Sequence, residues 1–389
     1  MFRFMPNRPA SSILFFTSAL LLAVVSCQKE AVPDPTTVIP NSGSQPTLPA
    51  TPYVYANLSL PAYLTTPPVI GQINSTTNNP ITDYAATLGR VLFYDVHLSE
   101  NNTTACASCH RQAFAFSDSA QFSTGFDGGQ TTRNSMSLLN AAYYPNGRYF
   151  WDERAASAEA QASRPIVNPV EMGMSMPKLV AKLQNLNYYP ILFKNAYGSA
   201  TVDSVRIVQA LAQFVRSMVS YRSKYDIGRA AFPPNQPPNV NFANFTAQEN
   251  QGKAIFFGAG NCAKCHGTET FTSPAARNNG LDLVYADNGV GTITGNPMQN
   301  GQFKAPSIRS IEKSGPYMHD GRFTTLDQVV EHYNSQVKPH PNLSPELRNP
   351  DGTPHRMNLT APQKAALIAF LKTLTDTGIS MDVKYSNPF

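Results

Sequence analysis

The chain has 389 residues, of which 42 % are hydrophobic and 14 % are charged, and its formal net charge is +5. That apolar content is sufficient for packed cores and excludes a wholly disordered chain. No run of like charges is long enough to indicate a nucleic-acid partner. At roughly 150 residues per domain, the length predicts two domains after a leader and a tail are set aside.

Residues 1–27 have the pattern of a bacterial lipoprotein signal peptide. Their apolar stretch, residues 13–25, is shorter than the about 20 residues that a helix needs to cross a bilayer. The stretch ends in Val-Val-Ser-Cys, which resembles a lipobox and makes Cys27 the lipidated first residue of the mature protein. The alternatives are a short membrane anchor and ordinary cleavage that removes Cys27. We therefore expect a periplasmic protein that only a lipid anchor tethers to a membrane.

Residues 28–61 are rich in Pro, Thr, Ser and Asn, a composition that predicts a disordered tether. Beyond the tether, apolar residues at helical spacing predict a mainly α fold, with little strand-type alternation. The predicted helices cover residues 81–95, 202–225, 246–258, 325–334 and 360–376. A proline-rich linker over residues 232–241 separates an N-terminal domain, residues 62–231, from a C-terminal domain, residues 242–389.

Each predicted domain carries a Cys-x-x-Cys-His string just after its first helix, CASCH at residues 106–110 and CAKCH at residues 262–266. In an exported protein this string is typical of c-type haem attachment, in which two thiols bond to the vinyl groups and the histidine ligates the iron. The residues that would hold the haems are Cys106, Cys109, His110, Cys262, Cys265 and His266. The alternatives are a zinc ribbon, which would need both pairs on one metal, and a thioredoxin dithiol, which would need a βαβ setting. The sequence thus predicts two cytochrome c-like domains, each with one covalently attached haem.

Several motifs around the two haem strings are similar to those of one protein family. In chain order they are LGRVLFYDVHLSENNTTACASCH, TRNSMSLLNA, FWDERA, QASRPIVNPVEM, APSIRS and PYMHDG. Over roughly residues 80–376 the chain resembles the bacterial dihaem cytochrome c peroxidase and MauG family. The resemblance implies a peroxidatic haem in the N-terminal domain and an electron-transfer haem in the C-terminal domain.

The resemblance also implies roles for residues of the N-terminal domain. Glu171 matches the acidic residue on the open face of the N-terminal haem, where a carboxylate can move a proton between the two peroxide oxygens. The alternative for Glu171 is a surface carboxylate. Gln161 and Pro165 match residues that line the same pocket. Trp151 matches the tryptophan between the two haems, where an indole can relay an electron; an aromatic core anchor is the alternative.

Position 126 distinguishes the branches of the family. In ordinary dihaem peroxidases a histidine there blocks the N-terminal iron until the other haem is reduced. The matching residue in this chain is Phe126, so we expect a five-coordinate N-terminal iron at rest. Other candidates for a sixth ligand are Met136, Met172, Met174 and Met176.

The sixth ligand of the C-terminal haem also distinguishes the branches. By the resemblance it is Tyr333, as in the MauG branch, where ordinary members have a methionine that raises the iron's potential. His332 is the alternative, and only one of the two can face the iron because neighbours on a helix point about 100° apart. His319 is expected beside this haem. The histidines predicted to be ordinary loop residues are His97, His340 and His355.

The family binds a calcium ion between its domains, and the matching residues here are Asn134, Ser314 and Pro316. Oxygen ligands suit calcium. Two of the three would contribute only backbone carbonyls, which any residue can supply.

The resemblance therefore implies an enzyme that reduces hydrogen peroxide at the N-terminal haem, with electrons supplied through the C-terminal haem. Its donor would be a small cytochrome or copper protein. The alternatives are a MauG-like oxidation of a protein substrate and a non-catalytic, membrane-tethered dihaem electron carrier. Because family members often dimerise, a homodimer is also implied.

Overall fold

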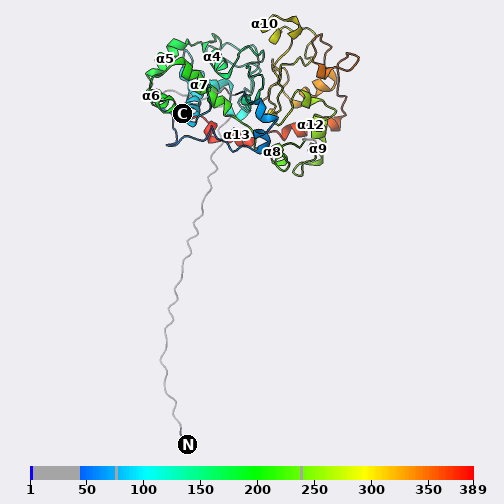
Figure 1. Ribbon diagram of the computed structural model, residues 1–389, viewed down its shortest axis with the longest axis horizontal. Helices are drawn as coiled ribbons and strands as arrows, with labels where there is room; N and C mark the ends of the chain where they lie inside the picture. Colours follow the sequence, from blue (N-terminus) through cyan, green and yellow to red (C-terminus); the bar gives the residue numbers. More distant parts are fainter. Residues whose placement is uncertain (3–43, 75–77, 237–239) are drawn as a thin grey trace. The chain divides into compact units, whose positions relative to one another are not determined.

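The computed structural model describes residues 1–2, 44–74, 78–236 and 240–389 (Figure 1). Cys27 and nearly all of the predicted signal peptide lie outside the described residues. The residues from 44 onward belong to one compact unit. Among the described helices, none is both long enough and apolar enough to cross a membrane.

The compact unit is mainly helical, as the sequence predicts (Figure 1). Its α-helices are α1 Ala62–Thr65, α2 Asp83–Tyr94, α3 Cys106–Cys109, α4 Ala158–Val167, α5 Met176–Gln184, α6 Tyr188–Tyr197, α7 Ser204–Arg216, α8 Lys224–Arg229, α9 Ala247–Phe257, α10 Val290–Thr294, α11 Leu326–Glu331, α12 Ala361–Lys372 and α13 Thr377–Met381. Long loops and short 3₁₀ turns join these helices, and the described residues carry only isolated β-bridges.

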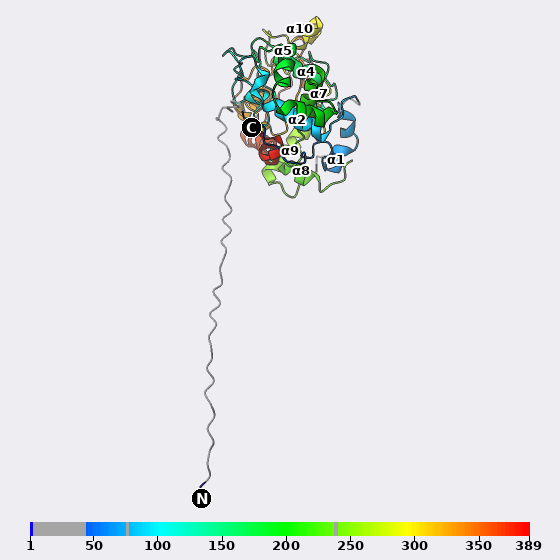
Figure 2. The same cartoon turned by 90° about the vertical axis from the view of Figure 1, so that its left-hand side faces the viewer.

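Helices α2 and α7 pack against each other in the first half of the unit (Figure 2). The side chain of Thr82 caps α2 by accepting a hydrogen bond from the backbone N–H of Ala85. Gly89 lies where the helices cross, and a Cβ at this position would overlap the carbonyl of Ala210. The first core forms around this crossing and includes Leu88, Leu92, Phe93, Leu211 and Phe214.

Helices α9 and α12 repeat this arrangement in the second half. Thr246 and Glu249 form a capping box that starts α9. Gly252 lies at the crossing, where a Cβ would overlap the carbonyl of Ala366. The second core includes Ile255, Phe256, Leu367, Phe370 and Leu371. In each half the helix that carries the crossing glycine thus comes before the CxxCH string in the sequence.

The structure differs from the predicted tether at its C-terminal end. Residues 44–61 are described, and Tyr55 is fully buried in the first core. Its hydroxyl donates a 2.6 Å hydrogen bond to the Lys384 carbonyl, and its N–H donates to the Asp83 carboxylate at 2.7 Å. The aromatic side chains in this Pro- and Thr-rich segment provide the apolar surface that packs it onto the domain.

The helix predicted over residues 202–225 also ends earlier than expected, because α7 stops at Arg216. Just beyond it the Ser217 hydroxyl donates back to the Phe214 carbonyl at 2.6 Å. The Ser220 N–H donates to the Asn140 side chain at 2.7 Å instead of to a helix carbonyl. Side-chain partners of this kind compete with helix continuation.

The last residues of the chain return to the first core. Ile379 and Tyr385 are buried there, although they follow the second half in sequence. The Tyr94 hydroxyl donates to the Tyr385 carbonyl at 2.6 Å. The predicted domain limits stay a prediction, and residues 237–239 of the predicted linker lie outside the described residues.

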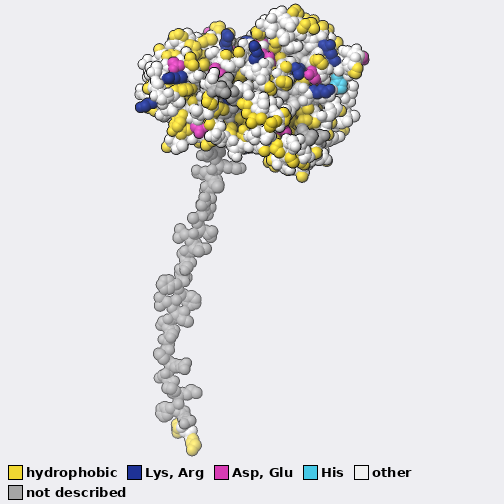
Figure 3. Space-filling view, in the orientation of Figure 1, with side chains coloured by type: hydrophobic (Ala, Val, Ile, Leu, Met, Phe, Trp, Pro, Cys, Tyr) yellow, Lys and Arg dark blue, Asp and Glu magenta, His cyan; other side chains and the backbone are white. Residues whose placement is uncertain are grey.

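The visible surface carries charges of both signs. In Figure 3 basic and acidic side chains are interspersed with apolar ones over the folded part. This distribution agrees with the sequence, in which no run of like charges occurs.

Candidate active site

The first CxxCH string forms α3 and ends beside a cavity of about 440 Å³, here called the first cavity, which Cys109 and His110 line. The imidazole Nδ1 of His110 lies 2.9 Å from the Phe116 carbonyl oxygen. That bond fixes the ring and leaves Nε2 free to ligate a metal. Cys106 packs against the first core.

The second string begins with a 3₁₀ turn, Cys262–Lys264, beside a cavity of about 220 Å³, here called the second cavity. Cys262, Cys265 and His266 all line it. The Nδ1 of His266 lies 3.3 Å from the Phe271 carbonyl oxygen, so its ring is held like that of His110.

The thiols do not have the properties of a redox dithiol. Burial raises the pKa of Cys106 to about 12 and that of Cys109 to about 11, whereas reactive dithiols have a lowered thiol pKa. Burial likewise raises the pKa of Cys262 to about 12. Within the described part of the chain, no three His, Cys, Asp or Glu side chains are grouped to hold a metal ion, which leaves the zinc alternative without a site there.

The lining of the second cavity suits a cofactor that carries polar groups. Three polar atoms of its lining residues are buried without a hydrogen-bond partner in the protein: Arg277 Nε, Glu346 Oε2 and His355 Nε2. Buried polar groups are nearly always paired, so these atoms indicate partners that the occupant supplies. His355, predicted to be an ordinary loop residue, thus belongs to the wall of this cavity.

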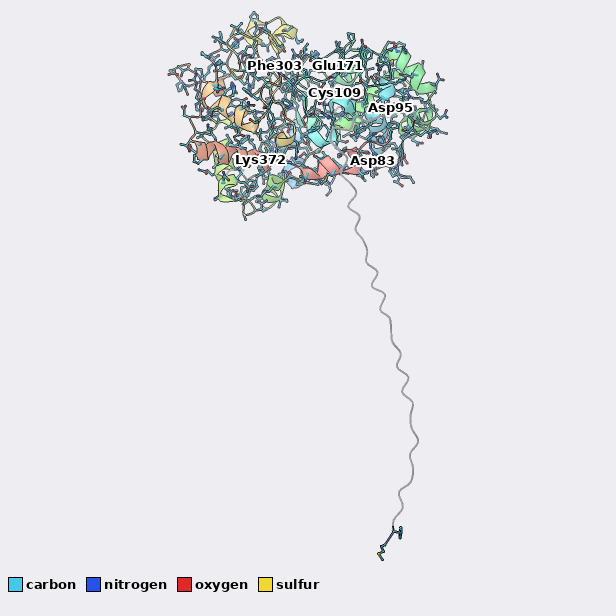
Figure 4. The ribbon with its side chains drawn as sticks, turned by 180° about the vertical axis from the view of Figure 1, so that it is seen from behind. Asp83, Asp95, Cys109, Glu171, Phe303 and Lys372 are labelled. Carbon is cyan, nitrogen blue, oxygen red and sulfur yellow. The ribbon has the colours of Figure 1, made fainter. Side chains whose placement is uncertain are left out.

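The predicted catalytic residues meet at the first cavity. Glu171, Gln161 and Pro165 all line it together with His110, as does Arg154. Figure 4 shows Glu171 near Cys109, with Phe303 of the second-cavity wall toward the other half.

The carboxylate of Glu171 is held from one side. Asn168, just after α4, donates a 2.8 Å hydrogen bond from its amide to Glu171 Oε1. Burial raises the pKa of Glu171, and the positive charge of Arg154 only partly offsets this effect. The carboxyl group is therefore suited to gain and lose a proton inside the cavity.

Trp151 lines both cavities and so lies between them. Its indole Nε1 donates to the Asn134 carbonyl at 2.8 Å. The ring also packs against the small apolar cluster of Leu281, Tyr285 and Phe303. Its position between the cavities agrees with the predicted relay, and its packing agrees with the alternative of a core anchor.

The described residues that line the first cavity do not include Phe126. Its N–H donates to the Glu171 carbonyl at 3.0 Å, and its ring packs over the α-carbon of Gly173. Of the four candidate methionines, only Met136 lines the cavity, whereas Met172 and Met174 are buried in the first core. Met176 packs against the same core from its edge.

Tyr333 and His332 point to different environments. Both lie in a π-helical turn, His332–Gln336, that follows α11. Tyr333 lines the second cavity, and its hydroxyl accepts a 3.4 Å hydrogen bond from the amide of Asn279. His332 is not among the described lining residues, and its Nε2 lies 3.1 Å from the Asn279 carbonyl oxygen. Burial raises the pKa of the Tyr333 phenol.

The three predicted calcium residues, Asn134, Ser314 and Pro316, all line the second cavity. Asn134 is buried, and its amide donates to the carbonyls of Ala120 and Gln121. His319, expected beside the C-terminal haem, lines the same cavity.

Sequence reasoning missed Lys304, a buried side chain that lines both cavities. It also missed Arg277 and Glu346, which pair at 3.2 Å beside the second cavity. A lysine directly before the APSIRS motif was a weak signal, because only the fold places it beside Trp151.

Comparisons with known proteins agree on one family. The family model described as di-haem cytochrome c peroxidase matches residues 83–230. The chain is 35 % identical over 301 residues to the methylamine utilization protein MauG of Methylorubrum extorquens, covering 76 % of this chain and 79 % of the relative. It is 29 % identical over 330 residues to the cytochrome-c peroxidase IdrP1 of Denitromonas iodatirespirans, and the match covers 77 % of this chain and 84 % of that relative. A solved structure of a MauG-like protein associated with microbial copper homeostasis is similar with a TM-score of 0.73 and 30 % identity, covering 85 % of this chain and 99 % of that one.

Proposed function

The chain belongs to the dihaem cytochrome c peroxidase and MauG family of oxidoreductases, which carry two c-type haems, and from this premise we propose that it reduces hydrogen peroxide. Reduction takes place at the haem that His110 holds, and electrons arrive through the haem that His266 holds. The observation that supports this best is the meeting of Glu171, Gln161 and His110 around one cavity.

The residues of the first cavity move the proton that this reaction needs. One peroxide, two electrons and two protons give two waters, and the bound haem supplies the redox-active iron. Glu171 accepts the proton of the near oxygen and returns it to the departing oxygen. The amide of Asn168 orients the carboxylate for both transfers.

Electrons would come from a small cytochrome or copper protein. They reach the first haem past Trp151, which lines both cavities. We expect the first iron to be open at rest, because His110 is the one histidine among the described residues that line its cavity; Met136 lines the same cavity and would be the candidate for a sixth ligand.

A MauG-like oxidation of a protein side chain is the second candidate, and Tyr333 at the second cavity favours it. A phenolate ligand lowers an iron's potential and favours its oxidised states. Reduced cytochrome c and a reduced copper protein distinguish the two reactions. Rapid peroxide-dependent oxidation of either donor supports the peroxidase. Peroxide reduction that leaves both donors reduced and is matched by oxidation of side chains of an added protein supports the second reaction.

Two further features belong to this proposal. Asn134, Ser314 and Pro316 would hold a calcium ion beside the second cavity, where all three lie. Lipidation at Cys27 would tether the enzyme to a membrane in the periplasm. Radiolabelled palmitate in expressing cells, with Cys27→Ser as the negative control, tests the lipid.

The Glu171→Gln variant tests the peroxidase proposal. We expect it to keep both haems and to lose about 10²–10⁴-fold in peroxide turnover, the usual contribution of general acid–base catalysis. Because the pKa of Glu171 is raised, protonation should already stop wild-type turnover at a pH above the ordinary range of a glutamate. The acid limb of the pH–rate profile should be absent from the variant.

Glu100→Gln is the matched control. Glu100 is a carboxylate near the same loop, since its N–H donates to the Met172 carbonyl, but its side chain pairs with Lys178 outside the cavity. The Glu100→Gln variant should leave peroxide turnover unchanged. Equal turnover in wild type and Glu171→Gln would overturn the assignment of Glu171, whereas no peroxide turnover in the wild type would favour the electron carrier.

A further inference from the structure

Lys304 is a buried cation at the junction of the two cavities. Its side chain lines both of them, and only 6 % of the residue is exposed. Its N–H donates to the Trp151 carbonyl at 2.7 Å, so it lies beside the residue between the haem sites. Among the described residues that line both cavities, Lys304 is the one with a charged side chain.

The protein satisfies this ammonium group only in part. Lys304 Nζ donates to the Arg148 carbonyl at 3.0 Å. The same atom lies 3.9 Å from the ring centroid of Tyr144 and 4.8 Å from that of Tyr149, distances typical of cation–π contacts. An ammonium group has three donors, and the carbonyl uses one of them.

No described carboxylate forms an ion pair with Lys304. The negative charge of Glu153 favours the charged form of Lys304, but the Glu153 carboxylate accepts its hydrogen bonds from the Tyr144 hydroxyl and the Asn146 amide. Burial therefore lowers the pKa of Lys304 to about 7. A buried ammonium needs an anion nearby to remain charged.

The haems bring such anions. The two thiols of each CxxCH string bond to the vinyl groups of a haem, so its two propionate carboxylates stay free as its anionic groups. We propose that Lys304 binds a propionate of one of the two haems at the junction of the cavities and thereby raises the reduction potential of that haem. The inference rests on the two haems and not on peroxide turnover.

The sign of the effect follows from charge. A cation beside a propionate offsets the negative charge near the iron, which disfavours the ferric form relative to the ferrous form. Removal of the cation should therefore lower the midpoint potential of the haem whose propionate it binds. The other haem, whose carboxylates lie elsewhere, should change less.

The test uses full-length holoprotein and needs no peroxide. Midpoint potentials of both haems are measured by spectroelectrochemistry in wild type, Lys304→Met, Lys304→Gln and Lys304→Arg. Resonance Raman spectra follow the propionate bending band, which reports hydrogen bonds to the carboxylate. We expect a lower potential and a shifted band in both neutral variants, and values near wild type in the arginine variant.

Lys253→Met is the matched control. Lys253 is also buried, donates to the Val240 carbonyl and lies 3.5 Å from the centroid of the Phe242 ring. Burial lowers its pKa to about 8, yet it is absent from the described linings of both cavities. The Lys253→Met variant should change the free energy of unfolding but not the midpoint potential of either haem.

Each outcome decides the question. The haem that shows the larger shift identifies the propionate that Lys304 binds. Unchanged potentials and Raman bands in haem-replete Lys304→Met and Lys304→Gln would overturn the proposal. Equal shifts in Lys253→Met would also overturn it, because they would trace the effect to general loss of packing. Failure of Glu171→Gln to affect turnover would leave these potentials untouched, so the two proposals fail separately.

Discussion

At the residue scale, two backbone carbonyls orient the proximal histidines. Phe116 and Phe271 accept from the Nδ1 atoms of His110 and His266, and both adopt left-handed conformations, with φ of 57° and 52°. Such φ values are uncommon for residues other than glycine. The same unusual backbone turn recurs in both halves of the unit, so it is part of how each haem ligand is held.

Replacement of Tyr333 should change the reduction potential of the second haem. The Tyr333→Met variant should raise the reduction potential of this haem by on the order of 0.1 V, within the roughly 0.8 V that axial ligands span, because a thioether favours the ferrous iron. Spectroelectrochemistry of the full-length holoprotein measures the shift.

His332→Phe is the control for this prediction. The Nε2 atom of His332 contacts the Asn279 carbonyl, and we expect the variant to keep the wild-type potential and spectrum. A second haem that responds to His332→Phe but not to Tyr333→Met would contradict the choice of Tyr333.

At the element scale, the two helix crossings depend on glycine. A Cβ at Gly252 would overlap the Ala366 carbonyl, which is backbone and cannot rotate away. The Gly252→Ala variant should lower the free energy of unfolding by about 1–3 kcal/mol or more, as overpacked cores do. Denaturant unfolding of the holoprotein measures this loss.

Gly71→Ala is the matched control, because nothing lies within 4 Å of a Cβ built at Gly71. Its free energy of unfolding should stay within about 0.5 kcal/mol of wild type. If Gly252→Ala were as stable as Gly71→Ala, α9 and α12 could move apart without a loss in the free energy of unfolding, which would contradict this prediction.

Helix starts were predictable because their caps are local. In the structure Thr246 with Glu249, and Thr325 with Gln328, form capping boxes at the starts of α9 and α11. The end of α7 was not predictable, since Ser220 bonds to Asn140, far away in the sequence. The π-helical turn after α11 also carries no local signal, although it places Tyr333 at its cavity.

At the scale of the whole molecule, buried polar links join distant segments. Both guanidinium–carboxylate contacts of Arg309 with Asp226 measure 2.7 Å, and both side chains are buried. The Tyr63 hydroxyl donates to the same carboxylate at 2.7 Å. One buried cluster thus ties together α1, α8 and the loop after α10 that carries Arg309.

The C-terminal residues should stabilise the first half of the molecule. Tyr385→Ala should lower the free energy of unfolding by about 3–5 kcal/mol, as expected for loss of a buried aromatic ring, and should perturb the first haem more than the second. Thermal unfolding followed at the bands of both haems measures the effect. Val383→Ala, at a position that is 57 % exposed, should change little, and a larger effect on the second haem in Tyr385→Ala would contradict this account.

The chemistry of the site could be predicted from sequence further than its geometry. The CxxCH strings indicate the haems on their own, because the two thiols that attach a haem and the histidine that ligates its iron lie within five positions. Glu171, Trp151 and Tyr333 were placed by family resemblance, and each lines a cavity. Lys304 and His355 could not be predicted, because their importance comes from contacts between segments distant in the sequence.

We expect the first haem to be open to peroxide and Glu171 to transfer protons there. The test is to add one equivalent of hydrogen peroxide to the fully oxidised, full-length holoprotein. Optical and EPR spectra are recorded immediately after the addition. The spectrum of the first haem should change promptly without prior reduction, and it should change much more slowly in Glu171→Gln. No change in the wild type until one haem has been reduced would contradict this expectation, because a sixth ligand would then block the first iron at rest.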